Sequence, residues 1–545
     1  MPDWQTQTIG QALRETTGTW GEKEALISAD RRYTYEELYD DACRLALGMS
    51  RLGIGKGDHV GTIFPIAPSW IITKYALHLL GAVLVPLNVN FKKREMEYVL
   101  RQARIKTLIT YDELPYGNYF DILEDIDPAI SAAEGKRIRS ESLPSLETVI
   151  CLSPAGRQYD FCHSFDRIES LGEGYKKEDI DGLLKNVRPS DPCNILFTSG
   201  STAFPKGAVH NHTSLLGIGE HLWGKTFNLS PSDTLLCYFP FYHIAGCVYN
   251  PLGAMMRGCA LVIHDFIPGD ILELIQKEKI SFFGGFDAHL NGIQDHPDWR
   301  QYDLNSVKFI LLATGPEWYD KCRTLFPKAD IIANHYGFTE GTGVSVMPDE
   351  TDEHVRKYTN GKPWPGIEVK VIDPETGERV PPGQGGELCL RGWSRLQGYF
   401  ENPEETAKAI DAEGFFHSGD YGWVDENGSV YYRGRYKMMV KTGGENVSQR
   451  EVEIFLEGMP GVKSVQVIGV PDEKWGEAVT AVIELEPGAD MTLEDVVAFS
   501  RGNIARFKVP KHVLFIQGEE WPLLGAGKVN KIALREIAVA RLDVG

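Results

Sequence analysis

The sequence predicts a layered α/β fold, and three observations support this class. Segments whose apolar residues recur at helical spacing alternate with short β-branched runs, which is the pattern of helices packed on sheets. The chain has 545 residues, enough for several cores, so we expect one large body of several parts with an appended domain. No internal repeat or low-complexity tract interrupts this pattern.

The elements are clearest near the start of the chain. Residues Glu36–Leu52 place apolar side chains on one helical face, and Val60–Phe64 is the next predicted strand. A helix over Ser69–Leu80 and a strand over Ala82–Pro86 follow. The stretch Leu114–Lys185 is acidic and poorly periodic, so we expect irregular structure there and assign no chemistry to it.

Net charge and hydropathy exclude some classes of binding partner. The formal net charge of −20 argues against nucleic acid or an anionic membrane as the main partner. Any nucleotide phosphate must then be met by local cations. The longest apolar run, Ala76–Val89, is shorter than the roughly 20 residues of a spanning helix. We therefore expect no membrane span.

The cysteines indicate a reducing compartment. Nine of them lie between Cys43 and Cys389, without a C-x-x-C pair or a His/Cys cluster at zinc spacing. The N-terminus has no basic-then-apolar signal segment. We expect buried thiols in a cytoplasmic protein.

One ten-residue segment, Thr198 to Gly207, carries hydroxyls, glycines and a single cation. Successive backbone N–H groups in a glycine-containing turn bind anions, the hydroxyls add donors, and Lys206 supplies a point charge. That combination suits a polyphosphate. A Walker A loop would need Gly before the lysine and Ser or Thr after it, where this chain has Pro205 and Gly207. The alternative is an ordinary surface loop.

The segment resembles the phosphate loop of the adenylate-forming superfamily of acyl-CoA synthetases, luciferases and peptide-synthetase adenylation domains. The resemblance spans nearly the whole chain. It implies an N-terminal body of layered sheets and helices over residues 1–434, with ATP and acyl pockets, and a small mobile α+β domain over 435–545. It also implies that ATP is held by Thr198, Ser199, Gly200, Ser201, Thr202 and Lys206. One departure is Ala203, where the family usually has Gly.

A second cluster, Asn334 to Gly341, resembles the family's Y-G-x-T-E element. The resemblance implies that Tyr336 stacks on adenine, that Thr339 contacts phosphate, and that Glu340 binds Mg²⁺ together with Thr202. A hard dication prefers carboxylate and phosphate oxygens, and an aromatic face suits a purine. The other positions that we assign to the nucleotide here are His335, Gly337 and, as a weaker match, Gly315.

A third group of motifs begins near residue 416. Phe416 to Asp420 resembles the element whose Asp accepts hydrogen bonds from both ribose hydroxyls, a task that suits an ionised carboxylate. The resemblance implies that Arg435 contacts ribose or phosphate and that Lys437 is the hinge of the C-terminal domain, although Met438 replaces an Asp common there. It also implies that the pantetheine tunnel of coenzyme A is lined by Lys441, Gly443 and Gly444.

Near the C-terminus, Gly527 and Lys528 match the family's G-K element, whereas Leu523 and Leu524 replace its usual Lys and Thr. The resemblance assigns Lys528 to bridging the substrate carboxylate and the α-phosphate of ATP. Without a cation, two unit anions at ~4 Å repel by ~4 kcal/mol at an effective dielectric of ~20. The alternative is a solvent-exposed lysine before the final helix.

The acyl pocket is expected after residue 239. Phe239 to Gly246 resembles the acyl gate, with His243 beside the carboxylate or the coenzyme A tunnel. Amino-acid-activating relatives have an Asp in this segment, and this chain does not, so amino acids are disfavoured. For the aromatic residues, plain core packing is the alternative. The substrate-binding set that we predict is Phe241, Tyr242, His243, Ala245, Gly246 and Phe286.

The reaction implied has two steps, an acyl-adenylate from a carboxylic acid and Mg·ATP and then a thioester with coenzyme A. The predicted catalytic residues are Lys528, Glu340, His243 and Lys437. Two alternatives stay open: an adenylating enzyme with another acceptor, such as a carrier-protein phosphopantetheine or oxygen, and a non-catalytic binding relative. The acid is expected to be fatty, alicyclic or aryl, and a homodimer is left open.

Overall fold

The computed structural model describes residues 2–198, 205–285, 287–312, 317–347, 350–436, 439–442, 445–472, 475–501, 503–504, 506–523, 528–542 and 544. Within them the chain forms two large mixed sheets, a small antiparallel sheet, a C-terminal sheet and a short hairpin of β6 (Glu113–Leu114) and β7 (Gly117–Asn118). The predicted α/β class is confirmed.

The first large sheet carries the phosphate segment at one side. Its strands β10, β4, β3, β5, β8 and β9 run parallel, and β11 and β21 continue it antiparallel beyond β10. The order is β21 (Gly398–Tyr399), β11 (Lys206–Asn211), β10 (Pro192–Thr198), β4 (Val83–Pro86), β3 (His59–Ile63), β5 (Thr107–Tyr111), β8 (Thr148–Leu152) and β9 (His163–Ser164).

The second large sheet is parallel in its centre and antiparallel at both edges. Its order is β18 (Lys362–Pro363), β17 (Gly341–Ser345), β16 (Ile331–Phe338), β15 (Phe309–Leu312), β14 (Phe282–Gly285), β12 (Thr234–Cys237), β13 (Ala260–Ile263), β1 (Glu24–Ile27) and β2 (Arg32–Thr34).

Helices cover both sheets, and one extensive buried cluster joins the layers. They are α1 (Ile9–Trp20), α2 (Tyr35–Arg51), α3 (Pro68–Leu80), α4 (Lys93–Gln102), α5 (Tyr119–Ile126), α6 (Phe165–Leu171), α7 (Lys177–Leu184), α8 (His212–Ile218), the π-helices η1 (Gly219–Thr226) and η2 (Ala245–Tyr249), α9 (Asn250–Arg257), α10 (Pro268–Lys277), α11 (Asp287–Asp295), the 3-10 helix η3 (Trp299–Gln301), α12 (Glu317–Leu325) and α13 (Glu353–Tyr358).

The predicted early elements match the structure to within a residue at each end. Helix α2 begins with a capping box, in which the side chains of Thr34 and Glu37 each accept a hydrogen bond from the other's backbone N–H. Helix α3 begins with Pro68, whose fixed φ suits the first helical turn, and ends at Gly81 in the left-handed conformation (φ 73°). Local sequence therefore accounts for these ends.

The expectation for residues 114–185 was wrong in part. This stretch contains three short helices and the strand β8, which pairs with β5 in the first sheet. Phe120, Leu123 and Val149 are buried in a second core cluster beneath it. Such short elements carry little periodicity of their own and are stabilised by tertiary packing.

The third and fourth sheets follow in the last third of the chain. The antiparallel third sheet is β19 (Ile367–Ile372), β20 (Gly386–Gly392), β22 (Phe416–Val424) and β23 (Val430–Arg435), and α14 (Pro403–Ala409) lies between β21 and β22 in the sequence. The fourth is β25 (Glu445–Ser448), β24 (Met439–Thr442), β27 (Gly476–Leu485) and β26 (Val462–Asp472), with β28 (His512–Phe515) beside β27.

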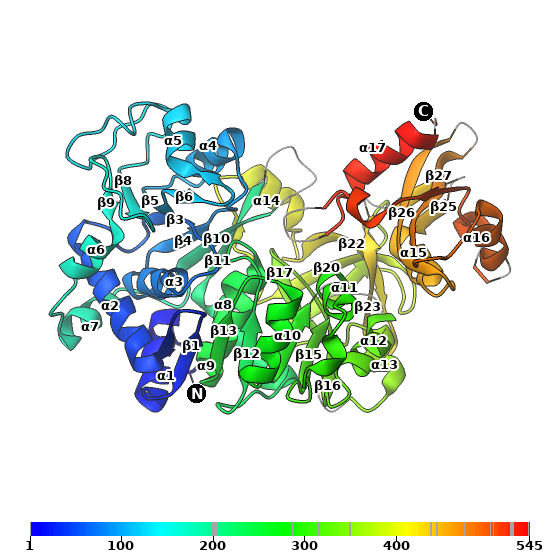
Figure 1. The fold of residues 1–545 in the computed structure, drawn as a ribbon, viewed down its shortest axis with the longest axis horizontal. Coiled ribbons are helices and arrows are strands. Elements are labelled where there is room, and N and C mark those ends of the chain that lie inside the picture. Colours follow the sequence, from blue (N-terminus) through cyan, green and yellow to red (C-terminus); the bar gives the residue numbers. More distant parts are fainter. Residues whose placement is uncertain are drawn as a thin grey trace.

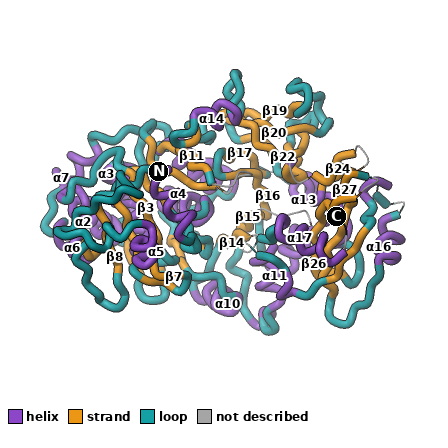
Figure 2. Tube along the Cα trace, turned by 90° about the horizontal axis from the view of Figure 1, so that it is seen from above, coloured by secondary structure: helices purple, strands orange, loops and turns teal. Residues whose placement is uncertain are grey.

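The C-terminal part forms a lobe at one end of the molecule, drawn in orange and red in Figure 1. Its two buried clusters contain residues from Val440 onward only. Figure 2 shows this lobe at the opposite end from α2 and α6. Its helices are α15 (Gln449–Glu457), α16 (Leu493–Ser500) and α17 (Lys531–Leu542), with the 3-10 turns η5 (Arg506–Lys508) and η6 (Gly518–Glu520).

Two expectations from composition can be compared with the structure. All nine cysteines are buried and free of disulfides, as predicted for thiols. Among the described residues, the helices are too short or too polar to cross a membrane.

Candidate active site

The predicted site residues follow the carboxyl ends of strands in the two large sheets. Thr198 ends β10, the acyl-gate segment follows β12, and Glu340 lies in the two-residue turn between β16 and β17. Ligands of open α/β sheets bind at these ends. The topology therefore gathers Thr198 and Glu340, which lie 142 residues apart in the chain, at one edge.

Glu340, which follows β16 of the second sheet, is hydrogen-bonded to two residues of the first sheet. Its Oε1 atom accepts hydrogen bonds from the Thr198 hydroxyl (3.2 Å) and the Tyr399 hydroxyl (3.0 Å). Beside it, the Nε2 atom of buried His210 donates to the carbonyl oxygen of Thr339 (2.8 Å), and burial lowers the pKa of His210 to about 4. A neutral imidazole thus ties β11 to the β16–β17 turn.

Lys206 begins β11 opposite Thr198 and is largely enclosed. It forms an ion pair with Glu405 of α14, and its ammonium lies 5.3 Å from the centre of the Tyr399 ring. The hydrogen bonds from Lys206 and Lys408 lower the pKa of Glu405 to about 2. Neither Tyr399 nor Glu405 was predicted as a site residue.

Asp420 forms the floor of the predicted ribose site. It is 2% exposed, it pairs with Arg435 in the β22–β23 register, and its Oδ2 atom accepts a hydrogen bond from the Tyr336 hydroxyl (2.8 Å). Tyr336 in turn stacks on Tyr432, with ring centres 5.2 Å apart. Burial raises the pKa of Asp420 to about 6, against the opposing effects of Arg435 and Tyr336.

The second oxygen of Asp420 retains acceptor capacity. Oδ1 lies 2.9 Å from the Nε atom of Arg435, yet no well-directed hydrogen bond reaches this buried oxygen from the described residues. Arg435 therefore pairs with Oδ1 by charge, while this oxygen can still accept a hydrogen bond. A buried carboxylate oxygen without an aligned donor is costly, and a ligand hydroxyl would satisfy it.

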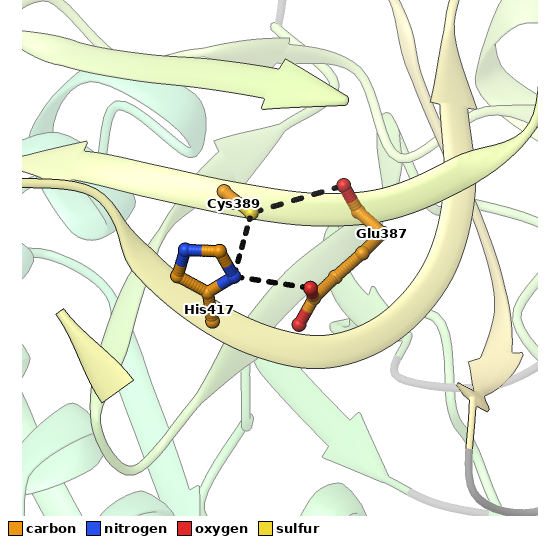
Figure 3. Close-up of side chains that lie close together, drawn as sticks. All are labelled: Glu387, Cys389 and His417. Carbon is orange, nitrogen blue, oxygen red and sulfur yellow. Dashed lines mark hydrogen bonds and ion pairs between the residues drawn. The ribbon is translucent and has the colours of Figure 1, made fainter. Parts of the chain in front are cut away.

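A brace of three side chains shapes the turn before Asp420 (Figure 3). Glu387 accepts hydrogen bonds from the Gly419 backbone N–H (Oε1, 2.8 Å) and from His417 Nδ1 (Oε2, 3.1 Å), while Cys389 Sγ lies 3.7 Å from the same nitrogen. Gly419 has φ 68°, which favours glycine. These three side chains offer ligand atoms to a metal ion, but both Glu387 oxygens already hold the turn.

Lys528 of the C-terminal lobe lies within electrostatic reach of the acyl gate. Burial, with a smaller contribution from the charge of Lys528, lowers the pKa values of His243 and His289 to about 4. His243 Nδ1 accepts from the Ala245 backbone N–H (3.2 Å), so its neutral ring carries the proton on Nε2. A contact between Lys463 and Asp295 (4.0 Å) also joins the lobe to α11.

The rest of the gate is tightly packed. Phe241 is buried and stacks on Trp70 of α3, with ring centres 4.2 Å apart and nearly parallel planes. Gly246 lies in η2, where a Cβ atom would come within 2.4 Å of two backbone carbonyl oxygens. π-Helical turns of this kind often occur at functional sites. Phe241 therefore makes the core contact that we considered as the alternative to substrate binding.

His335 and Gly337 lie on β16 behind Tyr336. The His335 ring is buried, stacks on Trp364 at 5.5 Å and shares a hydrogen bond of 2.8 Å with Thr342. A Cβ atom on Gly337 would approach Thr342 Oγ1 to 2.3 Å. Both positions thus determine how closely β16 and β17 pack.

Several predicted residues lie outside the described part of the chain. They are Ser199, Gly200, Ser201, Thr202, Ala203, Phe286, Gly315, Lys437, Met438, Gly443 and Gly444. For Lys441 the backbone is described, on β24 opposite Asn446.

Sequence reasoning missed the residues that act through contacts between elements far apart in the chain. Glu387, His417 and Tyr399 belong to this group, together with Glu405 and Tyr432. The one signal available was proximity to a predicted residue, because His417 stands three residues before Asp420 and Tyr432 three before Arg435.

With this geometry in hand, comparison with known proteins is decisive. The family model of AMP-binding enzymes matches residues 13–400, and that of the AMP-binding enzyme C-terminal domain matches 451–528. The chain belongs to the AMP-binding enzyme family. The predicted membership of the adenylate-forming superfamily, as an AMP-forming acid:CoA ligase, is confirmed, and its substrates are a carboxylate, ATP and coenzyme A.

Three relatives illustrate the match. The "Putative acyl-CoA synthetase YngI" of Bacillus subtilis (strain 168) is 32% identical, with 98% of each chain covered. The human mitochondrial medium-chain acyl-CoA ligase ACSF2 is 31% identical over 97% of this chain and 87% of its own. The crystal structure of ATP-bound MatB from Rhodopseudomonas palustris superposes with a TM-score of 0.82 at 26% identity, covering 97% and 99% of the chains.

Proposed function

We propose that this AMP-forming ligase activates a hydrophobic carboxylic acid, of the fatty, alicyclic or aryl class, and transfers the acyl group to coenzyme A. The observation that carries the site assignment is the electrostatic effect of Lys528 on the buried His243, which links the C-terminal lobe to the acyl gate. The buried Asp420–Tyr336 pair and the Thr198–Glu340 contact support the nucleotide half of the site.

In this proposal ATP lies across the strand ends. The adenine stacks on Tyr336, and the ribose hydroxyls donate to Asp420, whose Oδ1 atom has acceptor capacity to spare. Arg435 holds the Asp420 carboxylate and, through the Ser418 carbonyl oxygen (2.8 Å), the preceding turn. The phosphates are met by Lys206, Thr198, Thr339 and the hydroxyls and backbone of residues 199–202.

Glu340 suits a magnesium ion by its chemistry. Both of its hydrogen bonds from described residues go to Oε1, which leaves Oε2 as a hard oxygen ligand. We propose that Glu340 holds Mg²⁺ with the hydroxyl of Thr202. When bound, the ion would neutralise phosphate charge as pyrophosphate leaves. Tyr399 and Thr198 orient the carboxylate.

Lys528 supplies the charge that the first step requires. One oxygen of the substrate carboxylate bonds to the α-phosphorus, and the bond from that phosphorus to the bridging oxygen of pyrophosphate breaks. The two reacting groups are both anionic, so a lysine between them lowers the repulsion as they approach. His243 stays neutral at pH 7 because of its low pKa, so it adds a hydrogen-bonding wall to the acyl pocket without a competing charge.

The second step requires a different arrangement of the C-terminal domain. We propose that residues 435–545 rotate about Lys437, so that Lys528 leaves and the Lys441–Gly444 loop forms the pantetheine tunnel. The separate buried clusters from Val440 onward support a domain of this extent beside a body of residues 1–434. The coenzyme A thiol then attacks the acyl carbonyl and AMP leaves.

A pyrophosphate-release screen with aliphatic, alicyclic and aryl acids, with and without coenzyme A, tests the proposal. We expect release with a hydrophobic acid and an increase of turnover when coenzyme A is added. Release that ignores coenzyme A but requires another thiol or oxygen would favour a different acceptor. No release with any acid would favour a non-catalytic relative.

Location and assembly are part of the same proposal. We propose a cytoplasmic enzyme, from the buried free thiols and the acidic balance of charge, and a homodimer. Fractionation of cells and light scattering of the purified chain test these two statements independently.

A further inference from the structure

Lys206, the lysine proposed to bind phosphate, has a carboxylate partner in the structure. Its ammonium pairs with Glu405 Oε2 and faces the Tyr399 ring, and the side chain is 17% exposed. Glu405 lies in the first turn of α14, where its backbone N–H is capped by the Asn402 side chain. The lysine proposed to bind phosphate is therefore already bound to a carboxylate.

Glu405 is shared between two cations. Its Oε2 atom contacts Lys206, and its Oε1 atom lies 2.8 Å from the ammonium of Lys408, one helical turn further on. The Lys206 side chain is enclosed, whereas that of Lys408 is 70% exposed. A carboxylate of this kind retains one cation when it releases the other.

We propose that Glu405 is a built-in competitor for the phosphate-binding lysine, and that ATP binds by taking Lys206 from it while Lys408 keeps Glu405. This inference rests on the phosphate role proposed for Lys206. Glu405 touches no substrate and acts through Lys206, so it is a positioning residue that sets the apparent affinity for ATP.

Charge and geometry favour competition over cooperation. A triphosphate and a carboxylate at the same ammonium repel each other, so each of the two contacts of Lys206 weakens the other. Tyr399 links this pair to Glu340, because its ring faces Lys206 and its hydroxyl donates to Glu340. Movement of Lys206 toward phosphate thus takes place beside the residue proposed to hold magnesium.

The first test is Glu405→Gln, which removes the charge and keeps the shape. We expect the KM for ATP to fall about two- to fivefold, in the range of one partly exposed ion pair, with kcat unchanged or lower. Glu404→Gln is the matched control, since Glu404 is the exposed preceding residue on the same helix and forms no ion pair with a described residue. Its KM for ATP should equal that of the parent.

The second test removes Lys408. In Lys408→Met, Glu405 is left to Lys206 alone, so the KM for ATP should rise about twofold. The double variant should behave as Glu405→Gln does, because Lys408 acts only through Glu405. An equal rise in both backgrounds would mean that Lys408 attracts ATP directly, and it would contradict the shared-carboxylate scheme.

The controls separate this inference from the proposed function. An unchanged or higher KM for ATP in a folded Glu405→Gln protein, checked by its melting temperature, overturns the competition. In Lys206→Met the KM should rise strongly. If it does not, the phosphate role of Lys206 fails, whatever the Glu405 variants show.

Discussion

The two parts of the proposed active centre hold their functional groups in opposite ways. On the body, Asp420 is almost fully buried and is fixed by Tyr336, Arg435 and the braced turn before it. On the C-terminal lobe, Lys528 is exposed and meets the gate by its charge on His243 and His289. The lobe also has its own buried clusters.

This difference indicates which groups stay and which can leave. Moving Asp420 would expose a buried network, whereas Lys528 is exposed and acts on the buried His243 and His289 through its charge. In the proposed mechanism, nucleotide binding is a fixed property of the body, and the chemistry of each half-reaction depends on the position of the lobe.

The strongest test of the comparison is Lys528→Ala. Because Lys528 is assigned to the adenylation arrangement alone, the variant should lose acyl-adenylate formation by about 100-fold or more, while a supplied acyl-adenylate is still converted to thioester. Single-turnover assays of the two half-reactions measure this. An equal loss of acyl-adenylate formation and thioester formation would contradict the proposed domain rotation.

The complementary test, which targets the second half-reaction, substitutes a bulky residue in the pantetheine loop, for example Gly444→Trp. It should slow thioester formation by about 10-fold or more, because a narrow ligand needs close approach of the backbone. Pyrophosphate release in the first turnover should stay near that of the parent. Lost adenylation with retained thioester formation would show that the loop is wrongly assigned.

On the body, Asp420→Asn should weaken nucleotide binding without unfolding the protein. We expect the KM for ATP to rise about 10-fold, since the amide offers one acceptor instead of two. Burial raises the pKa of Asp420, so the charged form costs stability, and that cost appears as the pH rises from about 4 through 6. The melting temperature of the variant at pH 7 should therefore not fall, and a collapse would contradict this account.

The same pKa predicts a pH dependence. In the parent, the KM for ATP should rise as the pH falls through about 6, because protonated Asp420 accepts fewer hydrogen bonds from the ribose. Asp420→Asn should show no such change. An identical pH profile in both proteins would place the titration elsewhere.

A smaller effect is expected from Glu387→Gln in the brace. The amide supplies one oxygen for two donors, the Gly419 N–H and His417 Nδ1, so one of them loses its partner. We expect a loss of about 1–3 kcal/mol in stability and a rise of the KM for ATP of a few-fold, with kcat little changed. If the melting temperature and the KM for ATP are both unchanged, the turn before Asp420 does not depend on Glu387.

The smallest effect concerns Ala203, which lies outside the described residues. Ala is a poor choice at positive φ, so we expect negative φ there, and Ala203→Gly should destabilise the protein by ~0.5–1 kcal/mol through the entropy of the unfolded chain. Melting temperature and the KM for ATP measure this. A much lower KM with unchanged melting would indicate a strained loop and an impaired parent enzyme.

The sequence by itself determined the elements and motifs whose signal is local. Helix α2 could be predicted to within a residue from its periodicity, and the motifs from Thr198 to Lys528, in their order along the chain, identified the family. These signals need only neighbours along the chain, since helical spacing, caps and tight turns depend on residues a few positions apart.

Only the tertiary structure decided the partners of the motif residues. Glu405 reaches Lys206, Glu387 reaches Gly419, and Tyr399 reaches Glu340 across distances of 32 to 199 residues. Such pairs depend on the order and register of strands, and a shift of one residue turns a side chain to the opposite face. Register is set by the packing of whole sheets, so the sequence of either partner carries no local sign of the other.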